Sequence, residues 1–256
     1  MTQRRALTVP VLVTTPLERP TPLCALLWIH SGGMIVGSAQ LELSVIGRLA
    51  RELGAVVVSP NYRLAPEHPF PTALDDCMTS LRWMRAHANE LDVDPDRIAV
   101  AGASAGGGLS AAVAQRSHDE GIPLRAQALI YPMLDDRTVL RDHAGRGQFL
   151  WTPTSNQFGW TAHLGRAPRM SDAPNYAAPA RRTDLRNLPP TWIGVGELDL
   201  LYGESVAYAE TLKTCGVPCE IVTVPGMYHG ADVIAPNAAA MQGFRRSMVD
   251  HLRKHL

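Results

Sequence analysis

This chain contains few cysteines and has no net charge. The four cysteines lack metal-ligand spacing; Cys215 and Cys219 merely flank a Gly-Val-Pro turn. We therefore expect free thiols in a reducing cytoplasm and no metal site. Lys plus Arg equals Asp plus Glu, at 24 each, so the formal net charge is zero. This balance argues against nucleic acid or an anionic membrane as a partner.

Long apolar runs are also missing. No stretch approaches the roughly 20 residues that a membrane-spanning helix needs, and the first residues lack the apolar core of a signal peptide. Hydrophobic residues still make up 46% of the 256 positions, which is ordinary for a globular enzyme with a substantial core. The sequence predicts one cytoplasmic domain over residues 1–256, without repeats and without an integral membrane segment.

Short apolar runs alternate with segments of helical spacing. Buried strands are expected at residues 25–29, 55–59, 98–100, 126–131 and 191–195, a further strand at 219–224, and a strand at the sheet edge at 7–15. Helices are expected at residues 41–53, 72–89, 107–115, 204–215 and 237–255. This alternation predicts an α/β fold with a mostly parallel sheet and helices on both of its faces.

Residues 134–188 interrupt this alternation. The segment is rich in Pro, Arg, Asp and Gly, and only residues 155–164 have the pattern of a short helix. A long irregular insertion in a compact domain is usually a lid or a binding loop. We expect an inserted lid within the single domain.

The stretch Arg97–Gly108, with the sequence RIAVAGASAGGG, carries the first chemical signal. Glycines on both sides of Ser104 avoid Cβ clashes at a sharp turn between a strand and a helix. This arrangement is typical of a nucleophile elbow, which presents a serine at the carboxyl end of a sheet with a helix N-terminus behind it. The pentapeptide alone is weak evidence, because an ordinary Gly-rich turn can contain it.

A second glycine pair follows the strand predicted at 25–29. In His30-Ser-Gly-Gly33, the glycines leave backbone N–H groups bare, so that these donors can approach a negatively charged oxygen. Gly32 and Gly33, together with Ala105 after the serine, are expected to form an oxyanion hole. The alternative is a Gly-Gly turn that only joins a strand to a helix.

A serine nucleophile needs a base, and the base needs an acid that fixes its tautomer. Asp199 and His229 each follow a predicted strand, at the edge of the sheet where Ser104 projects. The chain order Ser, Asp, His is that of α/β-hydrolases. Ser104, Asp199 and His229 are therefore expected to form a catalytic triad, with Glu197 and Asp232 as less favoured acids.

These segments resemble the hormone-sensitive lipase family of α/β-hydrolases, which includes bacterial esterases. The resemblance runs from about Leu26 to the carboxyl end. It rests on residues 30–33, the elbow at 102–107, the acid and histidine segments, and the proline-rich Tyr62–Pro71. The resemblance implies an α/β-hydrolase fold with about seven to eight strands, the triad and oxyanion hole named above, and no metal or organic cofactor.

Three departures from the family pattern matter. Ser31 replaces a glycine that shapes the oxyanion loop, and Ala103 replaces the aspartate that usually precedes the nucleophile. Only 29 residues precede His30, so we expect most of the amino-terminal cap and one strand to be missing. The lid would then consist mainly of residues 134–188, leaving the site open unless a partner subunit covers it.

The function expected from these features is hydrolysis of small to medium acyl esters by a serine carboxylesterase, through an acyl-enzyme intermediate. The same triad could serve a lactonase, an amidase or an acyltransferase. The fold also occurs in small-molecule binding proteins that have lost the histidine. A homodimer fits the family. Candidate pocket residues are aromatic and methionine side chains near these loops or in the lid, namely Met34, Tyr131, Met133, Trp151, Phe158 and Trp160.

Overall fold

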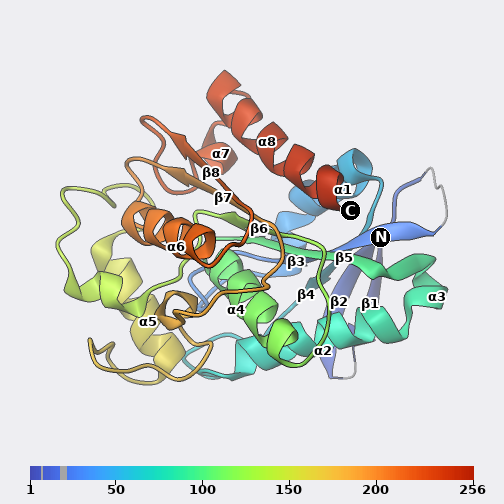
Figure 1. The fold of residues 1–256 in the computed structure, drawn as a ribbon, viewed down its shortest axis with the longest axis horizontal. Helices are drawn as coiled ribbons and strands as arrows, with labels where there is room; N and C mark the ends of the chain where they lie inside the picture. Colours follow the sequence, from blue (N-terminus) through green and yellow to red (C-terminus); the bar gives the residue numbers. More distant parts are fainter. Residues whose placement is uncertain (7, 18–21) are drawn as a thin grey trace.

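We describe a computed structural model of the chain over residues 1–6, 8–17 and 22–256 (Figure 1). One sheet of eight strands lies at its centre, in the order β1-β2-β4-β3-β5-β6-β7-β8. The strands are β1 (Thr2–Ala6), β2 (Val9–Thr14), β3 (Leu23–Ile29), β4 (Val56–Pro60), β5 (Val93–Ala103), β6 (Gln127–Ile130), β7 (Thr191–Gly196) and β8 (Cys219–Val224).

Helices and short 3₁₀ turns connect these strands. The α-helices are α1 (Leu43–Leu53), α2 (Thr72–Ala86), α3 (Ala88–Leu91), α4 (Ala105–Asp119), α5 (Pro153–Leu164), α6 (Tyr202–Thr214), α7 (Ala231–Ile234) and α8 (Ala239–His255). The 3₁₀ helices are η1 (Ala39–Glu42), η2 (Asp136–Leu140) and η3 (Pro179–Arg181). The predicted buried strands and the predicted helices are all confirmed, with shifted ends, and the helix expected at 72–89 is divided into α2 and α3.

The sheet is parallel except at its amino-terminal edge. β1 pairs with β2, and β2 with β4, in antiparallel register, whereas the pairs from β4 to β8 are parallel. The strand predicted at residues 7–15 is confirmed as β2, but its predicted place at the sheet edge is wrong, because β1 forms that edge. Leu7 lies outside the described residues. The expectation of a missing strand is also wrong. Thr2, Gln3 and Arg4 of β1 are exposed, which accounts for the lack of an apolar pattern in this part of the strand.

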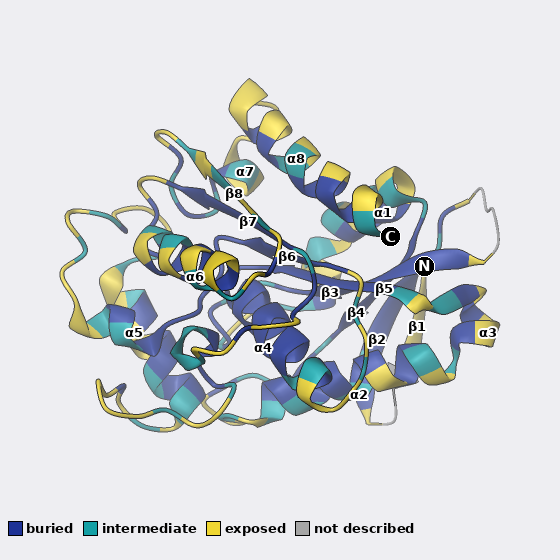
Figure 2. Ribbon diagram, in the orientation of Figure 1, coloured by how far each residue is buried: buried dark blue, intermediate teal, exposed yellow. Residues whose placement is uncertain are grey.

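Helices cover both faces of the sheet (Figures 1 and 2). Leu27 and Ile29 of β3 belong to the core that α2 and α4 cover, and Leu26 and Trp28 belong to the core that α1 and α8 cover. Successive side chains of a strand point to opposite faces, so a strand buried on both sides is apolar throughout. This double coverage explains the unbroken apolar run of β3.

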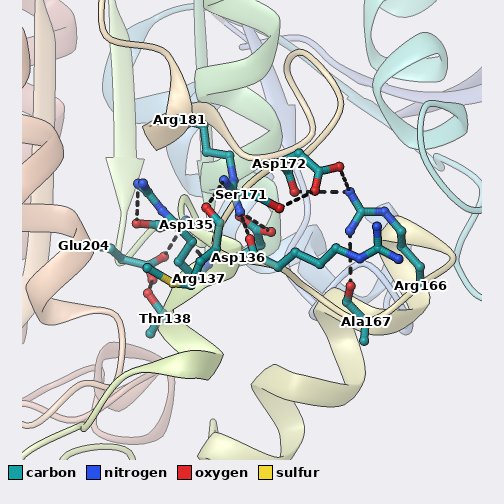
Figure 3. Close-up of polar contacts among 12 residues, drawn as sticks. Asp135, Asp136, Arg137, Thr138, Arg166, Ala167, Ser171, Asp172, Arg181 and Glu204 are labelled. Atoms are coloured by element: carbon teal, nitrogen blue, oxygen red, sulfur yellow. Dashed lines mark hydrogen bonds and ion pairs between the residues drawn. The ribbon is translucent and has the colours of Figure 1, made fainter.

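The insertion at residues 134–188 contains η2, α5 and η3, and its two ends are held together (Figure 3). Glu204, in the first turn of α6, accepts the Leu134 N–H at 2.6 Å. Arg181, near the other end, forms a two-bond ion pair with the fully buried Asp136 at 2.6 and 3.0 Å. These contacts fix the root of the insertion to the helix that follows β7.

Candidate active site

The turn between β5 and α4 holds Ser104 in a strained backbone conformation. Its φ of 56° and ψ of −119° are unusual for a residue with a side chain. A Cβ on Gly102 would lie 2.5 Å from the Gly106 carbonyl, and one on Gly106 would lie 2.0 Å from the carbonyl oxygen of Ile29. Backbone therefore packs directly on backbone around Ser104, which is the reason that an elbow requires both glycines.

Loops at the carboxyl ends of β5, β7 and β8 bring Ser104, Asp199 and His229 into one hydrogen-bonded chain. His229 Nε2 lies 3.0 Å from Ser104 Oγ, and His229 Nδ1 lies 2.8 Å from Asp199 Oδ2. Because a carboxylate can only accept, Nδ1 carries the proton and Nε2 can accept the Ser104 hydroxyl proton. The exposed fractions are 3% for Ser104, 0% for Asp199 and 8% for His229. This is the arrangement that activates a serine nucleophile.

Asp199, rather than either alternative acid, contacts the histidine. Its second oxygen, Oδ1, accepts the Leu201 N–H at 2.9 Å, so both carboxylate oxygens are held. Glu197 is exposed, and Asp232 accepts a hydrogen bond from the Tyr131 hydroxyl at 2.9 Å. Asp199 is buried and hydrogen-bonded through both of its carboxylate oxygens, so it is suited to orienting the His229 ring.

The loop after β3 lies against this turn, and its glycines adopt left-handed backbone conformations. Gly32 has a φ of 120° and Gly33 a φ of 61°. A Cβ on Gly32 would lie 1.9 Å from the Val36 carbonyl oxygen, so no larger residue fits there. In the part of the chain that the structure describes, the N–H groups of Gly32, Gly33 and Ala105 donate to no protein acceptor. Free donors beside a nucleophile are what an oxyanion hole needs.

Two polar anchors hold this loop in place. The His30 ring stacks on Tyr62 at 4.0 Å, and the Tyr62 hydroxyl donates to the His30 carbonyl at 3.0 Å. Burial lowers the pKa of His30, so its ring is neutral at pH 7. Ser31 donates its N–H and its hydroxyl to Glu42 Oε1, at 2.9 and 2.6 Å. Sequence analysis did not single out Glu42. Ser31 replaces a glycine of the family pattern, and its hydroxyl makes a hydrogen bond to Glu42 that a glycine could not make.

The six candidate pocket residues are placed differently from one another. Tyr131 contacts His229, with ring centroids 4.6 Å apart. The half-buried ring of Trp151 lies 6.2 Å from that of His229. Phe158 is 57% exposed. The other three are buried in the core that α2 and α4 cover, namely Met34, Met133 and Trp160.

Two further apolar residues of the insertion lie at the histidine loop and were missed by sequence analysis. The Phe149 ring is 5.2 Å from the Tyr228 ring, and Leu150 Cδ1 is 3.2 Å from the position that a Cβ on Gly230 would take. Both side chains are more than half exposed, at 56% and 60%. Phe149 and Leu150 directly precede Trp151 in a stretch without helical or strand periodicity. Their position next to Trp151 is the one sequence signal that could have identified them as site residues.

Over residues 1–6, 8–17 and 22–256, no group of His, Cys, Asp and Glu side chains is placed to hold a metal ion. Within the same residues, every helix is too short or too polar to cross a membrane.

Several known proteins that are similar to this chain are named as esterases. Residues 26–232 match a family described by the alpha/beta hydrolase fold. Carboxylesterase NlhH from Mycobacterium tuberculosis is 37% identical over 242 residues, which cover 92% of this chain and 76% of the relative. Ethyl acetate hydrolase from Pseudomonas putida is 33% identical over 235 residues, which cover 90% of this chain and 73% of the relative.

Solved structures agree with this result. A bacterial heroin esterase superposes with a TM-score of 0.92 at 39% identity, covering 97% of this chain and 80% of that one. A hyperthermophilic esterase from Pyrobaculum calidifontis superposes with a TM-score of 0.87 at 32% identity, covering 96% and 81%. Sequence and structure thus give the same answer: the chain belongs to the hormone-sensitive lipase-like family of α/β-hydrolases.

Proposed function

We propose that the chain is a serine carboxylesterase that hydrolyses small to medium acyl esters with Ser104 as nucleophile, His229 as general base and acid, and Asp199 as the residue that orients His229. The observation that carries the assignment is the continuous hydrogen-bonded chain from Asp199 through His229 to Ser104, with distances of 2.8 and 3.0 Å. The carboxylesterase names of the relatives support the reaction class.

The reaction uses these residues in two halves. Ser104 Oγ attacks the ester carbonyl while His229 Nε2 takes the hydroxyl proton, and the N–H groups of Gly32, Gly33 and Ala105 stabilise the oxyanion. The C–O bond to the alcohol then breaks as His229 returns the proton to the leaving oxygen. A water molecule, deprotonated by His229, then attacks the acyl carbon. The bond between that carbon and Ser104 Oγ breaks, His229 returns the proton to Oγ, and the acid is released. Asp199 stabilises the imidazolium in both halves, and no metal or organic cofactor takes part.

Residues 134–188 act as a lid inserted in a single domain, and they limit the substrate to small and medium acyl groups. Trp151 supports this role, because its ring lies close to both Gly33 and His229. The name of the ethyl acetate hydrolase from Pseudomonas putida supports a small ester.

A cytoplasmic location and a homodimer complete the proposal. The free thiols of Cys24, Cys77, Cys215 and Cys219 support a reducing compartment.

β8 supports the dimer, because among the described strands it lies at the edge of the sheet and pairs with β7 alone. Light scattering coupled to size-exclusion chromatography distinguishes a dimer near twice 27.8 kDa from a monomer.

The test is hydrolysis of p-nitrophenyl esters from acetate to decanoate by the parent and by Ser104→Ala. We expect turnover by the parent, greatest for the shorter acyl chains, and none above background for the variant. Equal rates for the two proteins would place the nucleophile elsewhere. If neither protein turns over any ester while the parent binds a small molecule tightly, the chain is a binding protein. Preference for a lactone, an amide or an acyl acceptor other than water would change the substrate class while keeping the triad.

A further inference from the structure

Tyr131, the first residue after β6, belongs to a segment that is bonded to the nucleophile's backbone on both sides. The Ser104 N–H donates to the Ile130 carbonyl at 2.9 Å, and the Met133 N–H donates to the Ser104 carbonyl at 3.0 Å. The Tyr131 N–H itself donates to the Gly194 carbonyl of β7 at 2.6 Å. Tyr131 has a φ of 34°, a conformation that costs energy for a residue with a side chain. The position of Tyr131 is therefore fixed relative to Ser104.

The side chain of Tyr131 extends from this fixed point to the histidine loop. Its ring meets the His229 ring edge to face, with centroids 4.6 Å apart and planes inclined at 60°. Its hydroxyl donates to Asp232 Oδ1 at 2.9 Å, and Asp232 stands in the first turn of α7, three residues after His229. Burial and the neighbouring Asp232 carboxylate raise the pKa of the Tyr131 hydroxyl well above its usual value, so it remains a donor.

The Asp199 bond alone does not determine the whole orientation of the imidazole. A single hydrogen bond at Nδ1 leaves the ring free to tilt about that contact, and a tilt moves Nε2 away from Ser104 Oγ. Tyr131 packs against the ring and removes this freedom, while Asp232 prevents the Tyr131 ring from swinging aside. Because Tyr131 is tied to Ser104, its contact with His229 relates the two reacting groups directly.

We propose that Tyr131 and Asp232 are positioning residues that hold His229 Nε2 in line with Ser104 Oγ. The inference rests on the proposed function, since it assigns a role in the same reaction. Neither residue exchanges a proton with the substrate; both act through the orientation of His229. Asp232, which the sequence offered only as a weaker alternative acid, takes part as the partner of Tyr131.

The test compares Tyr131→Phe, Asp232→Ala, the double variant and Asp232→Asn. Each is measured for kcat and KM with p-nitrophenyl acetate and for the rate at which a fluorophosphonate probe labels Ser104. We expect Tyr131→Phe and Asp232→Ala each to lower kcat and the labelling rate about tenfold, with KM within about twofold. The double variant should be no worse than either single variant. Asp232→Asn keeps an acceptor for the Tyr131 hydroxyl and should restore most of the parent's kcat.

Tyr208→Phe is the matched control, because Tyr208 is a buried tyrosine of α6 whose hydroxyl bonds to Gln115 Nε2 at 3.0 Å, outside the site. We expect it to lower the melting temperature without lowering kcat. If Tyr131→Phe keeps the kcat and labelling rate of the parent, the positioning role is wrong and the esterase assignment stands. A loss of kcat that merely follows the loss of stability in all variants, Tyr208→Phe included, also overturns the role. A parent that neither hydrolyses esters nor accepts the probe overturns the proposed function, and the positioning role with it.

Discussion

The indole ring of Trp151 lies directly against Gly33. A Cβ on Gly33 would come within 2.3 Å of Trp151 Cη2, and the Trp151 ring centroid is 6.2 Å from that of His229. Trp151 Nε1 donates to Asn156 Oδ1 at 3.1 Å, which fixes the indole to α5. One residue of the insertion therefore lies close to both the proposed oxyanion loop and the proposed base.

Replacing Trp151 by Ala should widen the range of acyl chains. The variant loses the ring that fills the space between Gly33 and His229, so longer chains gain room and apolar contact. We expect the ratio of kcat/KM for p-nitrophenyl octanoate to that for acetate to rise about tenfold. Phe158→Ala is the control, because Phe158 is a lid aromatic that is 57% exposed, and it should leave the ratio unchanged. Equal ratios for Trp151→Ala and the parent would remove Trp151 from the substrate pocket.

Asp199→Asn should abolish most activity while the fold persists. An amide at this position can donate to His229 Nδ1 and thereby favour the wrong tautomer, which costs about 10³- to 10⁴-fold in kcat. The measurement is steady-state kinetics with p-nitrophenyl acetate, with circular dichroism to establish folding. Glu197→Gln removes the exposed alternative acid and should change kcat less than about twofold. A larger effect from Glu197→Gln than from Asp199→Asn would reverse the assignment of the acid.

Gly106→Ala should destabilise the protein by about 3 kcal/mol or more, because its Cβ would lie 2.0 Å from the Ile29 carbonyl oxygen, where only backbone could yield. Gly243→Ala is the matched control. Gly243 lies within α8, with nothing within 4 Å of the added carbon, and alanine there should stabilise by roughly 0.5–1 kcal/mol. Urea unfolding of the two variants measures both effects. A stable Gly106→Ala variant would contradict the close approach of β3 and α4.

Glu204 should make stability fall as the pH rises. Burial raises its pKa from the usual 4.5 to about 8, so the folded state keeps a proton that the unfolded state has lost over this range. The parent therefore loses stability between about pH 4.5 and 8, at no more than about 1.4 kcal/mol per pH unit. Glu204→Gln has no titratable group at this position, so its free energy of unfolding in urea should decline less steeply as the pH rises. Glu210→Gln, on the exposed side of the same helix, should keep the parent's slope. Equal slopes for Glu204→Gln and the parent would show that Glu204 is charged in the folded state.

The sequence predicts the catalytic half of the sheet well because local rules operate there. Ser104, Asp199 and His229 each follow a strand that the sequence predicts, and parallel strands bring such positions to one edge. The glycines around Ser104 have a steric cause that can be read from the sequence. At these positions the backbone geometry permits few residue types, so the residue type predicts the geometry.

The parts that escaped prediction depend on contacts between segments far apart in the chain. The described side chains of β1, Thr2, Gln3 and Arg4, are exposed, so no apolar pattern marks this strand in the sequence. The contact between Trp151 and Gly33 joins an irregular insertion to a loop more than a hundred residues earlier, and no periodicity marks it.

The ion pair between Arg181 and Asp136 bears on how the insertion could move. It joins the two ends of the insertion, and Glu204 holds the Leu134 end. If entry of a bulky ester requires the insertion to move, we expect the residues between these contacts to move while the root stays docked. Turnover of bulky esters would then depend on the rate of that loop movement, and turnover of the smallest esters would not.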